Sequence, residues 1–448
     1  MLRSVTAEIS GWGNHSRQTS EIYRPESATE TEQLLTYDRI SSLLARGLGR
    51  SYGDSAVNGD GATVLLTHLN RFLSFDPETG VLECEAGVSL AHILQTFLPR
   101  GFFLPVTPGT KHVTVGGAVA NDVHGKNHHR DGAFSNCIIS FRLMLASGEI
   151  LTCSRESHPY LFWATVGGIG LTGFILTVRL RLVRIHSALF SVKYLRARNL
   201  DEALEMFTTT EKEYQYSVAW IDCLKGGRSL GRSVLMLGNP APDPAPETLK
   251  PSRNPFLRIP FYLPAGTLNS ATIGAFNEVY FRRHGSGQRL VHLESFFYPL
   301  DAILDWNRMY GRSGFVQYQV VLPPETSLRG MTRILEMLSA ARASSFLAVL
   351  KSLGPEGQGL LSFPKRGFTL ALDLPFRGPE VEALLNRLDG VVLENGGRVY
   401  LAKDSVLKRD VFREMYPRLG QFQEIKSHVD PNHLFSSSMA RRLGIMEA

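Results

Sequence analysis

Two glycine-rich segments constrain this chain more than any other feature. The first, Thr114 to Asn127, has a short β-like start, a glycine pair and small residues, and ends in asparagine, aspartate, histidine and lysine. The second, Arg46 to Asp54, has the same character. Glycine lacks a Cβ atom and tolerates positive φ angles, so its backbone can approach a large flat or phosphorylated ligand closely. The pair of segments therefore predicts a dinucleotide cofactor held between two loops.

Length and composition favour a globular protein of more than one domain. The chain has 448 residues, too many for a single hydrophobic core. Hydrophobic residues make up 43% and charged residues 20%, which excludes disordered and fibrous classes. The formal charge of +6 is spread out, without a Lys/Arg run or a Cys/His finger, so no nucleic-acid partner is expected. A mild basic excess fits acidic substrates and an anionic membrane surface equally well, or carries no functional meaning.

Targeting and cysteine signals are weak. The four cysteines are far apart and form no C-x-x-C pair, which argues against disulfides and a thiolate zinc site. Residues 1–20 lack the apolar stretch of a secretory signal, and no run of about 18 apolar residues predicts a membrane span. We expect a cytoplasmic protein, with peripheral contact at the inner face of the cell membrane as an open alternative.

Hydrophobic periodicity predicts an α+β fold. In the first part of the chain, helices are expected over residues 29–45 and 90–97, and strands over residues 62–66, 81–86, 137–145 and 173–183. In the second part, helices are expected over residues 200–214, 327–343 and 379–394, and strands over residues 217–222, 315–322, 347–350 and 368–374.

A proline-rich segment over residues 238–264 interrupts the second part. It is too long for a loop in a compact core, so it is a lid, a surface-binding segment or disordered chain. Its later half mixes Lys250, Arg253 and Arg258 with Phe256, Phe261 and Tyr262. That mixture would suit a phospholipid interface.

A nicotinamide-binding motif is not supported. The stretch Gly168 to Gly173 matches G-x-G-x-x-G, but this fingerprint requires a helix at its end, whose N-terminus binds the pyrophosphate. An alternating strand follows instead. The chain also lacks the P-loop pattern G-x-x-x-x-G-K-[ST]. The cofactor is therefore expected in a nest of backbone N–H groups from two loops.

Several further motifs give the chain a family resemblance. Six segments resemble the FAD-binding half of the vanillyl-alcohol-oxidase (PCMH-type) flavoproteins: Arg46 to Asp54, Pro108 to Thr110, Thr114 to Ala118, His124 to His129, Trp163 to Gly168 and Val429 to Phe435. Within that superfamily the chain is similar to the decaprenylphosphoryl-β-D-ribose oxidase family, through His124 to His129, Val316 to Gln319, Tyr400 to Ser405 and Ser438 to Arg442. The similarity covers nearly the whole chain in the right order.

The resemblance implies a two-domain α+β flavoprotein. Its FAD-binding domain would be discontinuous, with residues 1–186 and 398–448. Residues 187–397 would form a substrate domain whose antiparallel sheet covers the flavin, with the loop at about 238–264. The cofactor would be non-covalent FAD. Its expected binding residues are Gly47, Gly49, Arg50, Ser51, Tyr52, Gly53, Thr110, Thr114, Gly116, Gly117, Ala118, Asn121, His124, Gly125, Asn127, Tyr400 and Lys403.

The resemblance also implies an activity. The enzyme would oxidise the 2-hydroxyl of a polyprenylphosphoryl ribose to the 2-keto sugar, the first half of an epimerisation in cell-envelope arabinose biosynthesis. A keto-sugar reductase would complete it, and a quinone or oxygen would accept the electrons. The expected catalytic residues are Lys403, His124 and Tyr52, and the expected substrate-binding residues are Lys126, Gln317, Gln319, Lys351 and Thr369. The alternatives are an oxidase of soluble sugars, of the aldonolactone or alditol type, and a flavin-free glycolipid-binding protein.

The local sequence pattern supports two of these roles. Period-two alternation from Val399 places Lys403 on an apolar strand face, where burial would tune its charge. Alternatively the strand ends there and Lys403 reaches solvent. Gln317 and Gln319 share one strand face, which suits a sugar pocket but equally a solvated outer face.

Other positions are less clear. The spacing of His124 and His128 invites a metal site, but Gly125 and Asn127 argue against the helix that it needs, so no metal is expected. Tyr52 is either a proton acceptor or an aromatic packed over the cofactor. Ala371 and Thr369 stand where mycobacterial members of the family carry cysteine and asparagine, which changes the expected substrate contacts.

Overall fold

The computed structural model describes residues 2–242, 249–251, 257–264, 266–343 and 345–446. Much of the proline-rich segment predicted at 238–264, including Arg253 and Phe256, lies outside the described residues. The described part of that segment includes the end of β14 (Ser233–Pro240) and the short strand β15 (Leu257–Arg258). β15 pairs in parallel with β17 (Ile303–Leu304).

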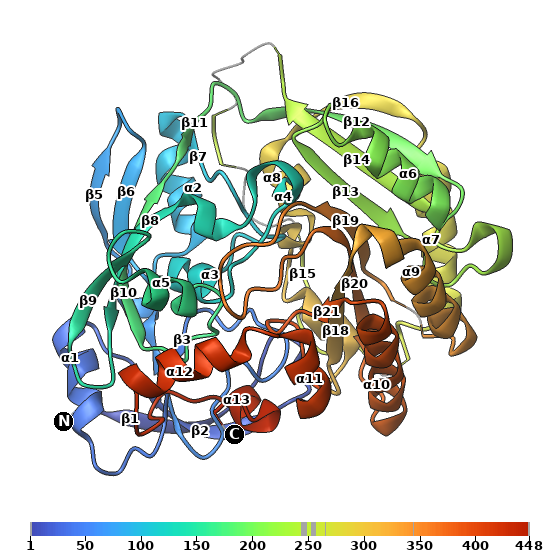
Figure 1. The fold of residues 1–448 in the computed structure, drawn as a ribbon. Coiled ribbons are helices and arrows are strands. Elements are labelled where there is room, and N and C mark those ends of the chain that lie inside the picture. Colours follow the sequence, from blue (N-terminus) through green and yellow to red (C-terminus); the bar gives the residue numbers. More distant parts are fainter. Residues whose placement is uncertain (1, 243–248, 252–256, 265, 344, 447–448) are drawn as a thin grey trace.

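The first part of the chain contains two sheets, on the left and at the bottom of Figure 1. One has four strands in the order β1-β2-β4-β3, and the other has five in the order β5-β6-β10-β8-β9. Their bounds are β1 (Ser4–Ile9), β2 (Gln18–Tyr23), β3 (Leu43–Arg46), β4 (Ala62–Leu65), β5 (Phe72–Asp76), β6 (Val81–Glu85), β8 (Ile138–Met144), β9 (Ile150–Ser154) and β10 (Phe174–Arg181). The helices are α1 (Ala28–Gln33), α2 (Leu90–Phe97), α3 (Val115–Ala120), α4 (His128–Asp131) and α5 (Pro159–Thr165), and β7 (Phe102–Phe103) pairs with β11 (Val183–Arg184).

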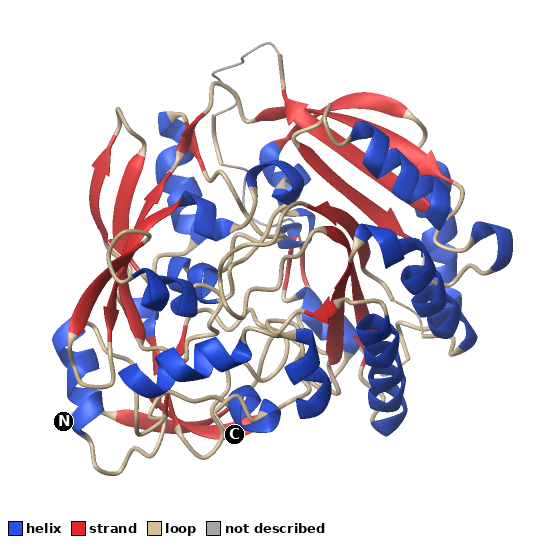
Figure 2. Cartoon of the chain, viewed as in Figure 1, coloured by secondary structure: helices blue, strands red, loops and turns tan. Residues whose placement is uncertain are grey.

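The second part is built on an antiparallel sheet of eight strands, in the order β16-β12-β14-β13-β19-β20-β18-β21. Its remaining bounds are β12 (Leu189–Ala197), β13 (Tyr216–Ile221), β16 (Gly287–His292), β18 (Phe315–Leu322), β19 (Ala348–Leu353), β20 (Gly367–Pro375) and β21 (Arg398–Val399). Its helices are α6 (Leu200–Thr210), α7 (Ser270–Arg283), α8 (Leu293–Phe297), α9 (Pro324–Ala340) and α10 (Pro379–Glu394). α6, α9 and α10 pack on one side of the sheet, and Figure 2 shows loops filling the space between its other side and the five-stranded sheet.

The C-terminal segment returns to the first sheets through α11 (Arg409–Met415), α12 (Leu419–Val429) and α13 (Ser438–Leu443). The Leu43 N–H donates to the Leu434 carbonyl at 2.7 Å, and Arg441 donates to Asn58 at 2.8 Å. Figure 1 shows these red helices beside the blue N-terminal strands. The domain boundaries at 186 and 398 remain a prediction. β21 (Arg398–Val399) is the last strand of the large sheet along the chain, and it lies at the second of these boundaries.

The structure corrects two local predictions outside the glycine-rich segments. The expected helix over residues 29–45 is wrong in its second half: Leu43 and Leu44 belong to β3, which pairs in parallel with β4. Their two successive apolar side chains are both buried, as in strands covered on both faces. The strand expected from Val399 to Lys403 stops at Val399. Lys403 lies in the turn that follows, and its N–H group donates to the Tyr400 carbonyl at 2.9 Å.

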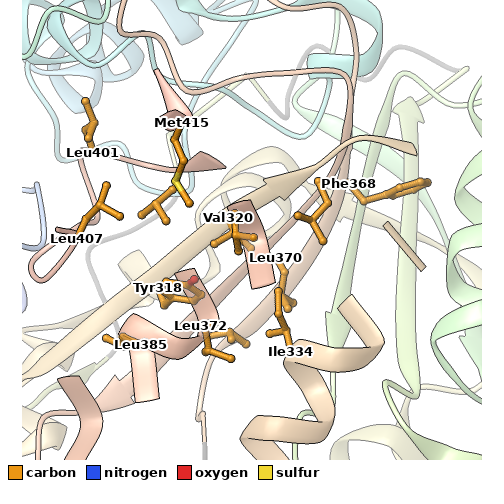
Figure 3. Packing of buried hydrophobic residues seen from close by; sticks show 14 of the residues in the cluster. Tyr318, Val320, Ile334, Phe368, Leu370, Leu372, Leu385, Leu401, Leu407 and Met415 are labelled. Carbon is orange, nitrogen blue, oxygen red and sulfur yellow. The ribbon is translucent and has the colours of Figure 1, made fainter. Parts of the chain in front are cut away.

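A continuous apolar core ties the large sheet to the C-terminal segment. Tyr318 and Val320 of β18, with Leu370 and Leu372 of β20, pack against Ile334 of α9 and against α10 (Figure 3). The same cluster includes Leu401, Leu407 and Met415 from the return segment. Within the described residues, no helix is both long and apolar enough to cross a bilayer.

Ile334→Ala should destabilise the protein by about 2–5 kcal/mol, because it leaves a cavity where the side chain is now 0% exposed. Leu328→Ala, on the same helix but 43% exposed, is the matched control and should cost much less. Denaturant unfolding followed by circular dichroism measures both. Equal losses for the two variants would contradict the assignment of this core.

Candidate active site

A cavity of about 580 Å³ lies between the two glycine-rich segments and the face of the large sheet that α9 and α10 leave uncovered. Most of the residues predicted for the site line it. They are Gly47, Gly49, Arg50, Ser51, Tyr52, Thr110, Thr114, Gly116, Gly117, Asn121, His124, Gly125, Lys126, Gln317, Gln319, Lys351, Tyr400 and Lys403.

Four expected site residues lie behind the cavity wall instead. Ala118 lies on the buried side of α3 and packs in the core, and Thr369 accepts a hydrogen bond from Gln319. The Asn127 side chain donates to the Pro105 carbonyl at 2.8 Å, so it braces the loop. A Cβ atom on Gly53 would lie 1.8 Å from the Asp404 carbonyl oxygen, so this glycine permits close backbone packing away from the cavity.

The first glycine-rich segment lines the cavity and has unused backbone donors. In the described part of the chain, the N–H groups of Leu48, Gly49, Arg50 and Ser51 have no hydrogen-bond acceptor. Consecutive N–H groups of this kind form an anion-binding nest. Gly47 brings this segment against the second one, because a Cβ atom there would lie 2.2 Å from Thr114 Oγ1.

The second segment is a helix start, which corrects the prediction of a β-like segment and of two loops. Thr114 is the N-cap of α3, and its hydroxyl accepts from the Gly117 N–H at 3.2 Å. Gly116 packs on Ala86, where a Cβ atom would approach the Ala86 Cβ to 2.9 Å. A Thr cap followed by small residues was a readable helix signal in the sequence.

Buried polar atoms without partners also face the cavity. Among the described residues, Ser55 Oγ, Asn121 Oδ1 and His124 Nδ1 are buried and have no hydrogen-bond partner. All three residues line the cavity. Because orphaned buried polar atoms are costly, they indicate a ligand that satisfies them.

His124 is held as a neutral imidazole. Burial, followed by the charge of Lys351, lowers its pKa well below the usual value. Its Nε2 lies 3.1 Å from the Gln319 amide nitrogen, which donates to a neutral ring. The ring centroid is 5.4 Å from that of Tyr400, whose hydroxyl donates to the Asn121 carbonyl at 3.0 Å.

The three neighbouring histidines do not converge. His128 Nδ1 accepts from the Gly354 N–H at 3.0 Å, and His129 Nε2 lies 3.1 Å from the Tyr214 carbonyl. In the described ranges, the side chains contain no group of three or more that could hold a metal ion.

Three lysines surround the polar end of the cavity. Burial lowers the pKa of Lys126 and of Lys403 to about 7, and that of Lys351 to about 8. Lys403 Nζ lies 3.8 Å from the centroid of the Tyr52 ring, and Lys126 donates to the Phe296 carbonyl. The lysine side chains touch the cavity interior while protein surrounds them on the other sides.

The two glutamines project from β18 into the cavity and not into solvent. Gln317 is 7% exposed and Gln319 is 4% exposed. Gln319 connects His124 to Thr369. The alternative of a solvated outer face is therefore wrong.

Several wall residues carried no signal in the sequence because they come from distant segments. Hydrogen bonds attach residues 107–111 to the segment after α8: Thr110 donates to Asp301 at 2.7 Å, and the hydroxyls of Thr107 and Tyr298 lie 2.6 Å apart. The Arg50 guanidinium lies 3.8 Å above the Trp12 ring. An apolar arm of the cavity extends along β12, β13, β14 and α7, with Tyr194, Trp220, Met236, Phe276, Tyr280 and Phe346.

Comparison with known proteins shows which families this chain is similar to. Residues 20–154 match the family model of an FAD binding domain, and residues 373–443 match that of D-arabinono-1,4-lactone oxidase. The chain is 37% identical to the decaprenylphosphoryl-β-D-ribose oxidase of Mycolicibacterium smegmatis, over 99% of this chain and 98% of that protein. It is 35% identical to an uncharacterised protein of Streptomyces coelicolor, over 80% of this chain and 100% of that protein. Mouse L-gulonolactone oxidase is 28% identical over 36% of this chain and 37% of its own length.

The fold, the cavity and the FAD-binding match define an FAD-dependent oxidoreductase of the two-domain vanillyl-alcohol-oxidase type. The site also fits this cofactor: residues with unused N–H groups, suited to a pyrophosphate, and residues with orphaned polar atoms line the same cavity. The similarity over the full chain identifies its branch. The chain belongs to the decaprenylphosphoryl-β-D-ribose oxidase family.

Gly47→Ala should weaken FAD retention at least about tenfold, because the new methyl group would displace Thr114 and with it the start of α3. Gly390→Ala, within α10 and with no atom in range of the added Cβ, is the control and should retain FAD normally. The ratio of flavin absorbance to protein absorbance after gel filtration measures this. Full flavin content in Gly47→Ala would show that the contact between the segments is not needed for binding.

Proposed function

We propose that this protein oxidises the 2-hydroxyl of a polyprenylphosphoryl pentose, with ribose as the sugar, to the 2-keto sugar. The observation that carries the proposal is the composition of the cavity. Its polar end gathers three lysines and two glutamines, whereas its other arm is apolar and aromatic. A ligand with a sugar, a phosphate and a lipid chain satisfies both ends.

Different side chains bind different parts of the substrate. Lys126 and Lys351 supply positive charge for the phosphate, and Gln317 and Gln319 supply amide groups for sugar hydroxyls. The aromatic arm of β13, β14 and α7 receives the first units of the prenyl chain, where burial of apolar area stabilises the complex.

Lys403 is the group best suited to take up the hydroxyl proton. When bound, FAD supplies the acceptor for the hydride that leaves the sugar carbon. Burial raises the pKa of the Tyr52 phenol well above its usual value, and His124 uses its Nε2 lone pair on Gln319, so both are poor bases at neutral pH. The pKa of Lys403, lowered to about 7, matches that of an effective base at this pH.

The further parts of the proposal follow from the chemistry. A 2-keto product becomes the epimeric alcohol only if a keto-sugar reductase returns a hydride, and the reduced flavin requires a quinone or oxygen as acceptor. The proposal includes non-covalent binding of FAD. Peripheral membrane contact is supported by two exposed groups of side chains: Leu257 and Phe261 with Arg258 in the same segment, and Val279 and Leu290 with Arg282, Arg283 and Arg289 close to them in the sequence.

A soluble-sugar oxidase of the aldonolactone type is the second candidate. The observation that favours it is the match of residues 373–443 to the lactone oxidase model. Such a substrate would use the polar end of the cavity and leave the apolar arm unused.

A short-chain polyprenylphosphoryl ribose, mixed anaerobically with the yellow protein, should bleach the oxidised-flavin absorbance rapidly. D-arabinono-1,4-lactone at the same concentration should not, because it lacks both the phosphate and the chain. Stopped-flow absorbance measures the two rates. Bleaching by the lactone alone would reject the lipid substrate in favour of the second candidate.

Lys403→Ala should bind FAD but reduce it about 10²–10⁴-fold more slowly, the usual range for loss of a general base. In the native enzyme the rate should rise with pH through about 7, as Lys403 loses its proton. The flavin-reduction rate from pH 5.5 to 9 checks both. Lys408→Ala, at an exposed position nearby, is the control. Native rates in Lys403→Ala would refute this role.

A further inference from the structure

One arginine joins the two segments that carry the tyrosine and the lysine of the cavity. Arg442, on α13, donates from Nε and Nη2 to the two carboxylate oxygens of Asp54, at 2.9 and 2.8 Å. The same Nη2 donates to Asp404 at 2.8 Å. A planar guanidinium with this set of bonds fixes the two carboxylates relative to each other, which a flexible ammonium group would do less well.

Both aspartates lie next to residues of the active site. Asp54 is two residues from Tyr52, and Asp404 directly follows Lys403. Tyr52 and Lys403 line the cavity, whereas the two aspartates do not. Asp54 is 5% exposed and Asp404 is 6% exposed, so water screens their interaction with the arginine only weakly.

The backbones of the two segments meet at the same place. The Tyr52 N–H donates to the Ala402 carbonyl at 2.9 Å, and a Cβ atom on Gly53 would lie 1.8 Å from the Asp404 carbonyl oxygen. Lys403 Nζ lies 3.8 Å from the centroid of the Tyr52 ring. The position of this lysine over the ring therefore depends on how firmly the two segments are held together.

Asp404 connects the arginine to the turn that carries Lys403. Its Oδ1 accepts from the N–H groups of Val406 and Leu407, at 2.9 and 2.8 Å, while its Oδ2 accepts from Arg442. Arg442 Nη1 also donates to the Leu407 carbonyl at 2.7 Å. A movement of the turn would therefore break its hydrogen bonds to the arginine.

The neighbouring arginine has different partners. Arg441, on the same helix, donates to the Asn58 side chain at 2.8 Å and to the Gly59 carbonyl at 2.7 Å. Its hydrogen bonds within the described residues reach neither Tyr52 nor the turn of Lys403. Both arginines attach α13 to the N-terminal part of the chain, but they differ in their connection to the active site.

We propose that Arg442 is a positioning residue for the reaction: its guanidinium holds Asp404 and Asp54 together and so fixes Lys403 over the Tyr52 ring. The proposal rests on the proposed role of Lys403 in proton transfer. Loss of the guanidinium should let the turn move, and a shift of about 1 Å at a reacting group can slow a reaction by about 10²-fold.

The first measurement uses the flavoprotein without substrate. Arg442→Lys keeps the positive charge but loses the planar fork. Hydrogen–deuterium exchange with mass spectrometry should show the amides of Tyr52 and Lys403 exchanging about tenfold faster in this variant, because the contact between their segments opens more often. Arg441→Lys is the matched control and should leave both exchange rates unchanged. Native exchange rates in Arg442→Lys would overturn the proposal.

The second measurement separates positioning from stability. Reduction of the flavin by saturating short-chain polyprenylphosphoryl ribose should be about 10–100-fold slower in Arg442→Lys, with flavin content and substrate affinity close to native. In a Lys403→Ala background the same substitution should have little further effect, because it acts through that lysine. An equal loss of rate in both backgrounds, or a native rate in Arg442→Lys, would contradict the positioning role.

Asp404→Asn is the second variant, and it decides the matter if Arg442→Lys does not fold. It keeps an acceptor for the amides of the turn but removes the charge that faces Arg442, so both measurements should change in the same direction by less. Native values in this variant would count against the proposal. If the native protein is not reduced by the lipid-linked sugar, the function proposed above fails, while the exchange rates still decide whether Arg442 holds the turn.

Discussion

The register of β18 against β20 is the constraint on which the site depends. Gln317 lies opposite Asp373 and Gln319 opposite Ala371 across the ladder, and Gln317, Gln319 and Ala371 line the cavity. The alternate residues, such as Tyr318 and Leu372, pack into the core beneath. Because strand side chains alternate with period two, a slip of one residue would bury the amides in the core and turn apolar side chains to the cavity. The same strand register therefore determines both which side chains form the core and which line the site.

This alternation is also why the sequence predicted that part of the site well. Amides at positions 317 and 319 between Val316, Tyr318 and Val320 predict two faces of one strand, and both faces are occupied as the pattern requires. The prediction for Lys403 named a residue that does face the cavity, but for the wrong reason. The strand ends at Val399, and a turn carries the lysine over Tyr52. Short alternating runs cannot distinguish a strand from a turn, because the pairing partner that decides it is distant in sequence.

The glycine-rich segments show a similar limit. Their composition predicted that backbone could approach a ligand closely. The two segments lie against each other at positions such as Gly47, where no Cβ atom fits. The helix that begins at Val115 was not predicted because its small residues show no apolar periodicity, and the one available signal was the Thr114 cap. Residues such as Trp12, Phe296 and Asp301 could not be predicted. They reach the cavity only through the packing of segments that are hundreds of residues apart.

The balance of charge in the cavity also bears on the choice of substrate. Lys126, Lys351 and Lys403 all line the cavity, and burial lowers the pKa of each of them. Lys126 has an aromatic ring and a carbonyl as its neighbours, which leave its charge uncompensated. An uncharged lactone would cover these lysines without neutralising them, whereas a phosphodiester-linked sugar would bring the missing negative charge. The same ligand would also fill the aromatic arm. Desolvated cations and an apolar arm within one cavity thus favour a lipid-linked phosphate over a neutral sugar acid derivative.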